Sequence, residues 1–137
     1  MDDFGKALEL TSDRIVLKIV YGARGDAFVR MEHFDRALAD YESGAEFANG
    51  LLCPFDQRQA YALYRKGDTE GALAKLAEFS KVHFMNLNTS CVLGLHDIIR
   101  DQRERARSHF MRVLDYTPSW QEEYFIATEE LKRLDAE

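Results

Sequence analysis

A spacing of 34 to 35 residues recurs along this chain in three separate series of positions. One series consists of small residues, a second of alanines and a third of bulky residues. The series are Gly25, Ala60 and Gly94; Ala37, Ala72 and Ala106; and Tyr41, Leu76 and Phe110. A repeat of this length indicates a structural unit that stacks on copies of itself, because one copy alone cannot bury its apolar face.

Within each copy, the spacing of these positions predicts a pair of helices. The two small residues are 12 apart, and the second precedes the bulky residue by four. This suits two helices of about three to four turns, joined by a tight connection such as Arg65–Asp68 in the second copy. A small residue on each helix lets the axes approach at the short end of the usual range of about 8–10 Å. We expect the bulky residue to fill the gap against the next pair.

Apolar residues at i, i+3, i+4 and i+7 mark the second helix of each pair. They are Phe34, Ala37, Leu38, Tyr41, Ala45 and Ala48; Ala72, Leu73, Leu76 and Phe79; and Ala106, Phe110, Val113 and Leu114. Asn49-Gly50 suits a helix end, Cys53-Pro54 a helix start, and 86–90 offers several N-caps. With only 2 prolines and 8 glycines to form the turns of a sandwich or barrel, the chain of 137 residues is expected to be one all-α domain.

Further helices are expected at both ends of the repeats, which span about 18–51, 53–86 and 87–120. In the N-terminal segment 1–12, apolar residues form a short helical stripe, and Thr11-Ser12-Asp13 offers caps for a long helix over 13–31. That helix is apolar nearly all round at 15–21, so we expect the N-terminal segment, or alternatively a dimer partner, to cover it. Residues 119–137 predict a capping helix with one apolar stripe. The stripe is Trp120, Tyr124, Thr128, Leu131 and Leu134, with Glu122, Glu123, Glu129 and Glu130 mostly elsewhere.

These series resemble the tetratricopeptide repeat family over roughly 18–120. The family's small position in the first helix matches Gly25, Ala60 and Gly94, its alanine early in the second helix matches Ala37, Ala72 and Ala106, and its bulky position matches Tyr41, Leu76 and Phe110. Its closing proline matches Pro118 alone, and its first-helix tryptophan is replaced by Tyr21, Asp56 and Ser90. The resemblance implies a right-handed superhelical stack of three antiparallel helix pairs with a C-terminal capping helix.

In this family the first helices line a concave groove that holds peptides, which implies a groove here too. The positions carried over are Ala23, Asp26 and Arg30; Gln57, Arg58, Tyr61, Tyr64 and Arg65; and Asn88, Cys91, Leu95 and Ile98. Arg58, Tyr61 and Arg65 share one helix face through their spacing alone, and tyrosine and arginine are frequent interface hot spots. Alternatively, Tyr61 and Tyr64 pack between neighbouring helices. Family members that clamp the carboxylates of chaperone tails are a poor match, because Gly22 and Val92 offer no donor and Asp26 would repel a carboxylate.

No pattern in the sequence supports catalysis, a cofactor or a metal. The histidines and cysteines lack the spacing of a metal site, Lys66–Gly71 lacks the ending of a phosphate loop, and no two carboxylates form an obvious acid–base pair. Two cysteines make no disulfide framework, which favours a reducing, cytoplasmic location. The apolar run 15–23 contains Lys18 and is about half the length of a membrane span.

Charge is uneven along the chain, which has a net charge of −6. Residues 57–112 carry 10 Lys/Arg against 6 Asp/Glu, whereas both ends are acidic. An acidic chain is unlike a nucleic-acid binder, but its basic middle would attract an acidic segment of a partner; the alternative is a set of solvated helix faces. The sequence therefore predicts a non-enzymatic interaction module that binds a peptide or protein segment. A small secretion-type chaperone and a self-assembling scaffold, including a homodimer, stay open as alternatives.

Overall fold

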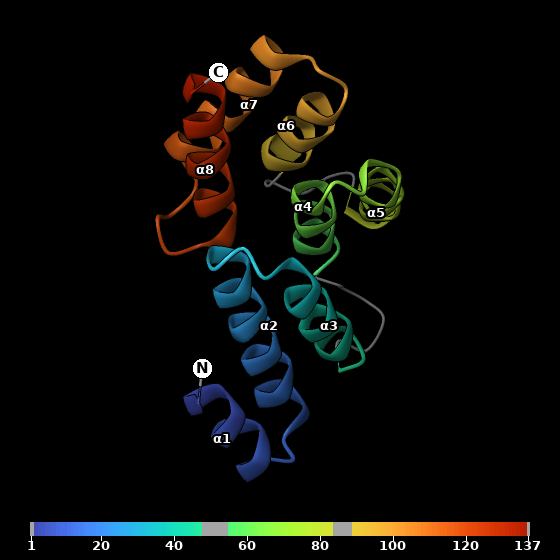
Figure 1. Cartoon of the computed structure of the whole chain (residues 1–137), viewed down its shortest axis with the longest axis vertical. Helices are drawn as coiled ribbons and strands as arrows, with labels where there is room; N and C mark the ends of the chain where they lie inside the picture. Colours follow the sequence, from blue (N-terminus) through green and yellow to red (C-terminus); the bar gives the residue numbers. More distant parts are fainter. Residues whose placement is uncertain (1, 48–54, 84–88, 137) are drawn as a thin grey trace. The chain divides into compact units, whose positions relative to one another are not determined.

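A computed structural model describes residues 2–47, 55–83 and 89–136, and over these ranges the chain forms eight α-helices and no strand (Figure 1). The all-α prediction is confirmed. The helices are α1 (Asp2–Leu10), α2 (Arg14–Arg30), α3 (Phe34–Ala45), α4 (Asp56–Lys66), α5 (Thr69–His83), α6 (Thr89–Ile99), α7 (Arg103–Tyr116) and α8 (Glu122–Ala136). None of these described helices is long and apolar enough to cross a membrane.

The chain divides into two compact units, Met1–Glu78 and Phe79–Glu137. The first unit contains α1 to α4 and most of α5, and the second contains the end of α5 with α6, α7 and α8. In the first unit α3 packs against both α2 and α4, and in the second α7 packs against both α6 and α8. The expected helix starts and ends at Asn49-Gly50, Cys53-Pro54 and 86–88 lie outside the described residues.

The three turns that join α2 to α3, α4 to α5 and α6 to α7 have the same backbone geometry. Each contains one left-handed residue, namely Glu32 (φ 61°), Gly67 (φ 104°) and Asp101 (φ 61°). In each turn the next residue donates its N–H to the carbonyl five positions earlier, at 2.8 Å in all three. The bonds are His33 to Phe28, Asp68 to Leu63 and Gln102 to Asp97. This is the Schellman ending of a helix, and it recurs with the 35- and 34-residue spacing of the sequence.

The bulky residue of a pair packs on the small residue of the same pair. A Cβ added at Gly25 would lie 2.6 Å from Cε1 of Tyr41, and one added at Gly94 would lie 2.6 Å from Cε1 of Phe110. The absence of a side chain therefore lets the ring rest on the helix backbone. Each of these two rings therefore has its seat 16 residues earlier in its own pair, and the expected contact with the next pair is present for Tyr41. Tyr41 additionally stacks on Phe55, with ring centroids 5.9 Å apart.

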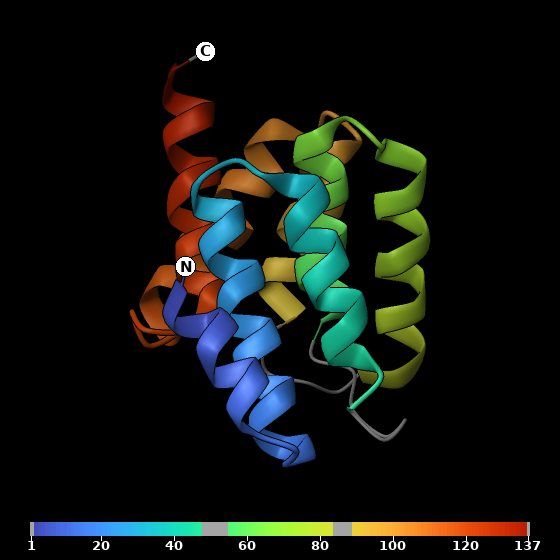
Figure 2. The ribbon, with the colours of Figure 1, turned by 60° about the horizontal axis from the view of Figure 1, so that its bottom comes forward.

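The long first helix forms where the sequence predicts it, but the N-terminal segment covers only part of its apolar surface. The carboxylate of Asp13 caps α2 by accepting from the N–H groups of Ile15 (2.9 Å) and Val16 (3.2 Å). Helix α1 runs beside α2 (Figure 2), yet Ile15 is 67% exposed and Ile19 is 60% exposed. The expectation that the N-terminal segment covers this helix is therefore met only in part, because α1 packs against α2 but leaves these two isoleucines exposed.

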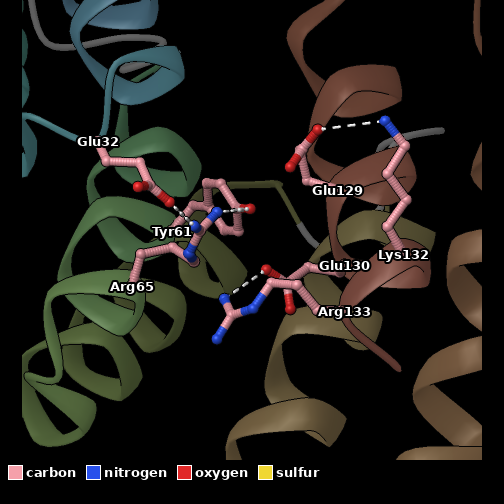
Figure 3. Close-up of polar contacts among 7 residues, drawn as sticks. All are labelled: Glu32, Tyr61, Arg65, Glu129, Glu130, Lys132 and Arg133. Atoms are coloured by element: carbon pink, nitrogen blue, oxygen red, sulfur yellow. Dashed lines mark hydrogen bonds and ion pairs between the residues drawn. The ribbon is translucent and has the colours of Figure 1, made fainter. Parts of the chain in front are cut away.

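The buried face of α8 differs from the predicted stripe. Trp120 lies before the helix and is exposed, and of the predicted stripe only Leu134 is buried. The buried side chains are Glu122, Ile126, Ala127, Glu130 and Leu134. The prediction that the glutamates lie mostly off the buried face is therefore wrong for Glu122 and Glu130. Apolar content did not fix the rotation of this helix, because a buried carboxylate is tolerated when it is paired, and Glu130 accepts from Arg133 at 3.0 Å (Figure 3).

Candidate binding site

A hollow of about 330 Å³ lies between α2 and the start of α4 in the first unit. Helix α2 lines it with Lys18, Ile19, Gly22, Ala23 and Asp26, and the start of α4 contributes Phe55 and Arg58. Three positions carried over to the groove, Ala23, Asp26 and Arg58, thus meet at one place. Asp26 and Arg58 are 32 residues apart in the sequence, and the helix pairing brings them together.

Glycine allows α4 to begin close to α2. A Cβ at Gly22 would lie 2.8 Å from Cε1 of Phe55, and one at Gly44 would lie 3.1 Å from the same ring. The ring of Phe55 is therefore wedged against both α2 and α3, and it is buried. Arg58 is three residues after Phe55 and lies in the first turn of α4. The packing of Phe55 therefore fixes the position of Arg58 relative to α2.

The carboxylate of Asp26 is engaged from two sides. The hydroxyl of Tyr41 on α3 donates to Oδ1 of Asp26 at 2.5 Å. Nε of Arg58 lies 3.4 Å from the same oxygen, and the guanidinium carbon of Arg58 lies 5.9 Å from the centre of the Phe55 ring. Although Nε of Arg58 is buried, it makes no hydrogen bond within the described residues. The Asp26 side chain is 14% exposed and that of Arg58 is 23% exposed, so the cation is the more accessible of the two.

Arg65 is directed to a different place from Arg58. It donates to the hydroxyl of Tyr61 at 2.8 Å and to Glu32 in the α2–α3 turn at 2.9 Å (Figure 3). Its guanidinium also lies 5.2 Å from the centre of the Phe34 ring. Arg65 therefore connects the end of α4 to the α2–α3 turn. The three residues predicted to share one binding face, Arg58, Tyr61 and Arg65, do not all line the hollow, because only Arg58 reaches it.

Several predicted groove residues are buried. Tyr61 is 1% exposed, Gln57, Cys91 and Leu95 are also buried, and the Tyr64 ring lies 6.3 Å from that of Tyr61. Tyr61 lies 35 residues after Asp26, and Leu95 lies 69 residues after it, so the three residues occupy the same position in the three copies. The side chain at this position is poorly exposed in every copy. The packing alternative for Tyr61 is thus favoured. Arg30 is exposed at the end of α2, Ile98 is half-buried, and Asn88 lies outside the described residues.

Sequence reasoning missed Lys18, Ile19 and Phe55 as parts of this hollow, and it named Gly22 only as a clamp position that offers no donor. Ile15 and Ile19, four positions apart on α2, carried the signal, because an apolar pair on a helix without a visible cover leaves one face available. Phe55 gave no comparable signal, since it precedes its helix and belongs to no stripe. Its role depends on two glycines from other helices.

The second unit offers no reactive thiol at Cys91. Burial, followed by the charges of Glu123, Glu122 and Glu130, raises the pKa of the Cys91 thiol well above its ordinary value. The thiolate is the nucleophilic form, so this side chain is inert at neutral pH. Over the described ranges, no three histidine, cysteine or acidic side chains gather where they would hold a metal ion.

No family model, curated protein or solved structure matches this chain. The candidate site accordingly rests on the residues and distances given above.

Proposed function

We propose that this chain is a non-enzymatic interaction module of the tetratricopeptide repeat type. In this proposal, the three helix pairs form a right-handed superhelical stack capped by α8, and a peptide or protein segment of a partner binds in the α2–α4 hollow. The three equivalent turns and the two equivalent glycine–ring contacts support the repeat. The observation that carries the function is the meeting of Ala23, Asp26 and Arg58 from separate repeats at a hollow.

The surface beside the hollow supports a macromolecular partner. Ile19 lines the hollow and is 60% exposed, and Ile15 lies one turn earlier on α2. Exposed apolar side chains that adjoin a hollow are typical of interaction sites. A volume of about 330 Å³ is at the lower end of the range of about 300–1,000 Å³ for ligand pockets. Such a hollow suits one or two side chains of a bound segment.

The same apolar side chains favour self-assembly as a second candidate. Leu10 at the end of α1 is exposed together with Ile15, Val16 and Ile19 on α2. A second copy of the chain that covered these residues would also remove them from water. Sedimentation as a function of concentration separates this alternative, because only a scaffold gains mass as the chain is concentrated.

Capture from a native cell extract tests the module function. Ala23→Leu fills the hollow from α2, and Ala39→Leu makes the same change at an exposed position of α3. We expect the wild type and Ala39→Leu to retain the same bound protein and Ala23→Leu to lose it, with all three melting at similar temperatures. Equal capture by all three chains would contradict binding in the hollow.

A further inference from the structure

The chemistry of the α2–α4 hollow indicates which kind of segment it takes. We propose that it binds an acidic amphipathic peptide, in which an apolar side chain enters the hollow and a neighbouring carboxylate lies between Lys18 and Arg58. This inference rests on the proposed function, since it names the partner class of the same site.

The apolar part of the argument concerns the floor and one wall of the hollow. Gly22 is buried against the ring of Phe55, and Ala23 beside it carries only a methyl group, so small and apolar groups line this part of the hollow. Ile19 stands at the edge with 60% of its surface exposed. An apolar guest side chain would cover this isoleucine and remove its surface from water, which is favourable in proportion to the area covered.

The charged part of the argument concerns the balance of cations and carboxylates. The hollow is lined by two cations, Lys18 and Arg58, and by one carboxylate, Asp26. Lys18 makes no ion pair with any described residue, whereas Asp26 already accepts from Tyr41 and pairs with Arg58. The mostly buried Asp26 therefore leaves one positive charge uncompensated at the mouth. A guest carboxylate would be drawn to that charge, and a guest cation would be repelled.

A selection with a random peptide library tests the inference whatever the natural partner is. Twelve-residue peptides displayed on phage are selected against the full chain, against Lys18→Glu and against Lys6→Glu. Lys6 is an exposed residue of α1 outside the hollow, so Lys6→Glu makes the same change of charge elsewhere. We expect the wild type and Lys6→Glu to enrich peptides with Leu, Ile, Met or Phe beside Asp or Glu. We expect Lys18→Glu to enrich peptides with Lys or Arg in place of the acid.

Fluorescence anisotropy on one enriched peptide then gives the size of the effect. Lys18→Glu and Arg58→Gln should each weaken its binding about tenfold or more, in the range of hot-spot residues, and Lys6→Glu should weaken it less than about twofold. Enriched peptides that need an open hollow, because Ala23→Leu abolishes their binding, but that show no acidic preference would overturn this inference and leave the proposed function standing. Peptides unaffected by Ala23→Leu, or no enrichment at all, would overturn both.

Discussion

The first helix pair, α2–α3, and the third, α6–α7, share a backbone plan but differ in the chemistry placed on it. In both pairs an aromatic ring rests on a glycine 16 residues earlier. In the first pair the hydroxyl of Tyr41 donates to Asp26, whereas the equivalent positions of the third pair are Phe110 and Leu95, both fully buried and without a polar side-chain atom. The first pair thus has both the hydroxyl and the carboxylate, and the third pair has neither. This indicates that the ring-on-glycine packing is common to the two pairs, whereas the hydrogen-bonded polar groups occur together in one pair only.

A second polar contact also differs between the first and the third helix pair. Arg24 on α2 donates from Nε and Nη2 to the two oxygens of Asp40 on α3, at 2.8 and 2.7 Å, and these bonds raise the pKa of the guanidinium. The equivalent positions of the third pair are Leu93 and His109, and His109 lies 3.4 Å from Asp97 on α6 instead. Both pairs therefore have a polar contact between their two helices, but the first uses a bidentate guanidinium–carboxylate pair, whereas in the third His109 and Arg105 of α7 lie 3.4 and 3.9 Å from Asp97 of α6.

Removing the ring from either pair should have the largest effect. Tyr41→Ala and Phe110→Ala each empty a fully buried position, and truncations of this kind typically cost about 3–5 kcal/mol in the free energy of unfolding. We expect Tyr41→Ala to cost at least as much as Phe110→Ala, because it also removes the hydrogen bond to Asp26. Urea unfolding followed by far-ultraviolet circular dichroism measures both. A loss below about 1 kcal/mol for either variant would show that its ring is not seated as described.

Moving the hydroxyl between the pairs should have an intermediate effect. Tyr41→Phe removes a hydrogen bond to a carboxylate and should cost about 1–2 kcal/mol. The reverse change, Phe110→Tyr, places a hydroxyl in an apolar site near Leu95 and should cost about 1–3 kcal/mol. The same urea experiment measures both variants. If Phe110→Tyr were neutral or stabilising, the third pair would have a partner for the hydroxyl, and the contrast between the two pairs would be wrong.

The sequence predicted the helix pairs because the constraint behind them is local and repeated. Small and bulky residues recur at fixed spacing, and the three turns obey it even though only Gly67 is a glycine; Glu32 and Asp101 adopt the same left-handed conformation. The helix pairs could therefore be predicted from this single sequence.

The site was less predictable, because it depends on how one helix is rotated and anchored against others. Periodicity placed Tyr61 on the same face as Arg58, but it could not show that the ring of Tyr61 turns inward while Arg58 reaches Asp26. Phe55 acquires its place from Gly22 and Gly44, which belong to different helices. The same reason explains the incorrect stripe of α8, where the buried Glu130 is compensated by Arg133.

The smallest effect on the free energy of unfolding is expected from removing the exposed ion pair Arg107–Asp135 of the second unit. The half-buried pair Arg24–Asp40 of the first unit serves as the comparison. Nη1 of Arg107 lies 2.6 Å from Asp135, but the two side chains are 35% and 69% exposed. Exposed pairs contribute about 0–1 kcal/mol, and at about 1 M salt the screening length falls to roughly 3 Å. Arg107→Ala should therefore change the free energy of unfolding by no more than about 0.5 kcal/mol, and high salt should remove the difference. Arg24→Ala is the matched control, because it leaves the carboxylate of Asp40 buried without its bidentate partner and should cost more at every salt concentration. Equal costs for the two variants would mean that burial does not distinguish these pairs.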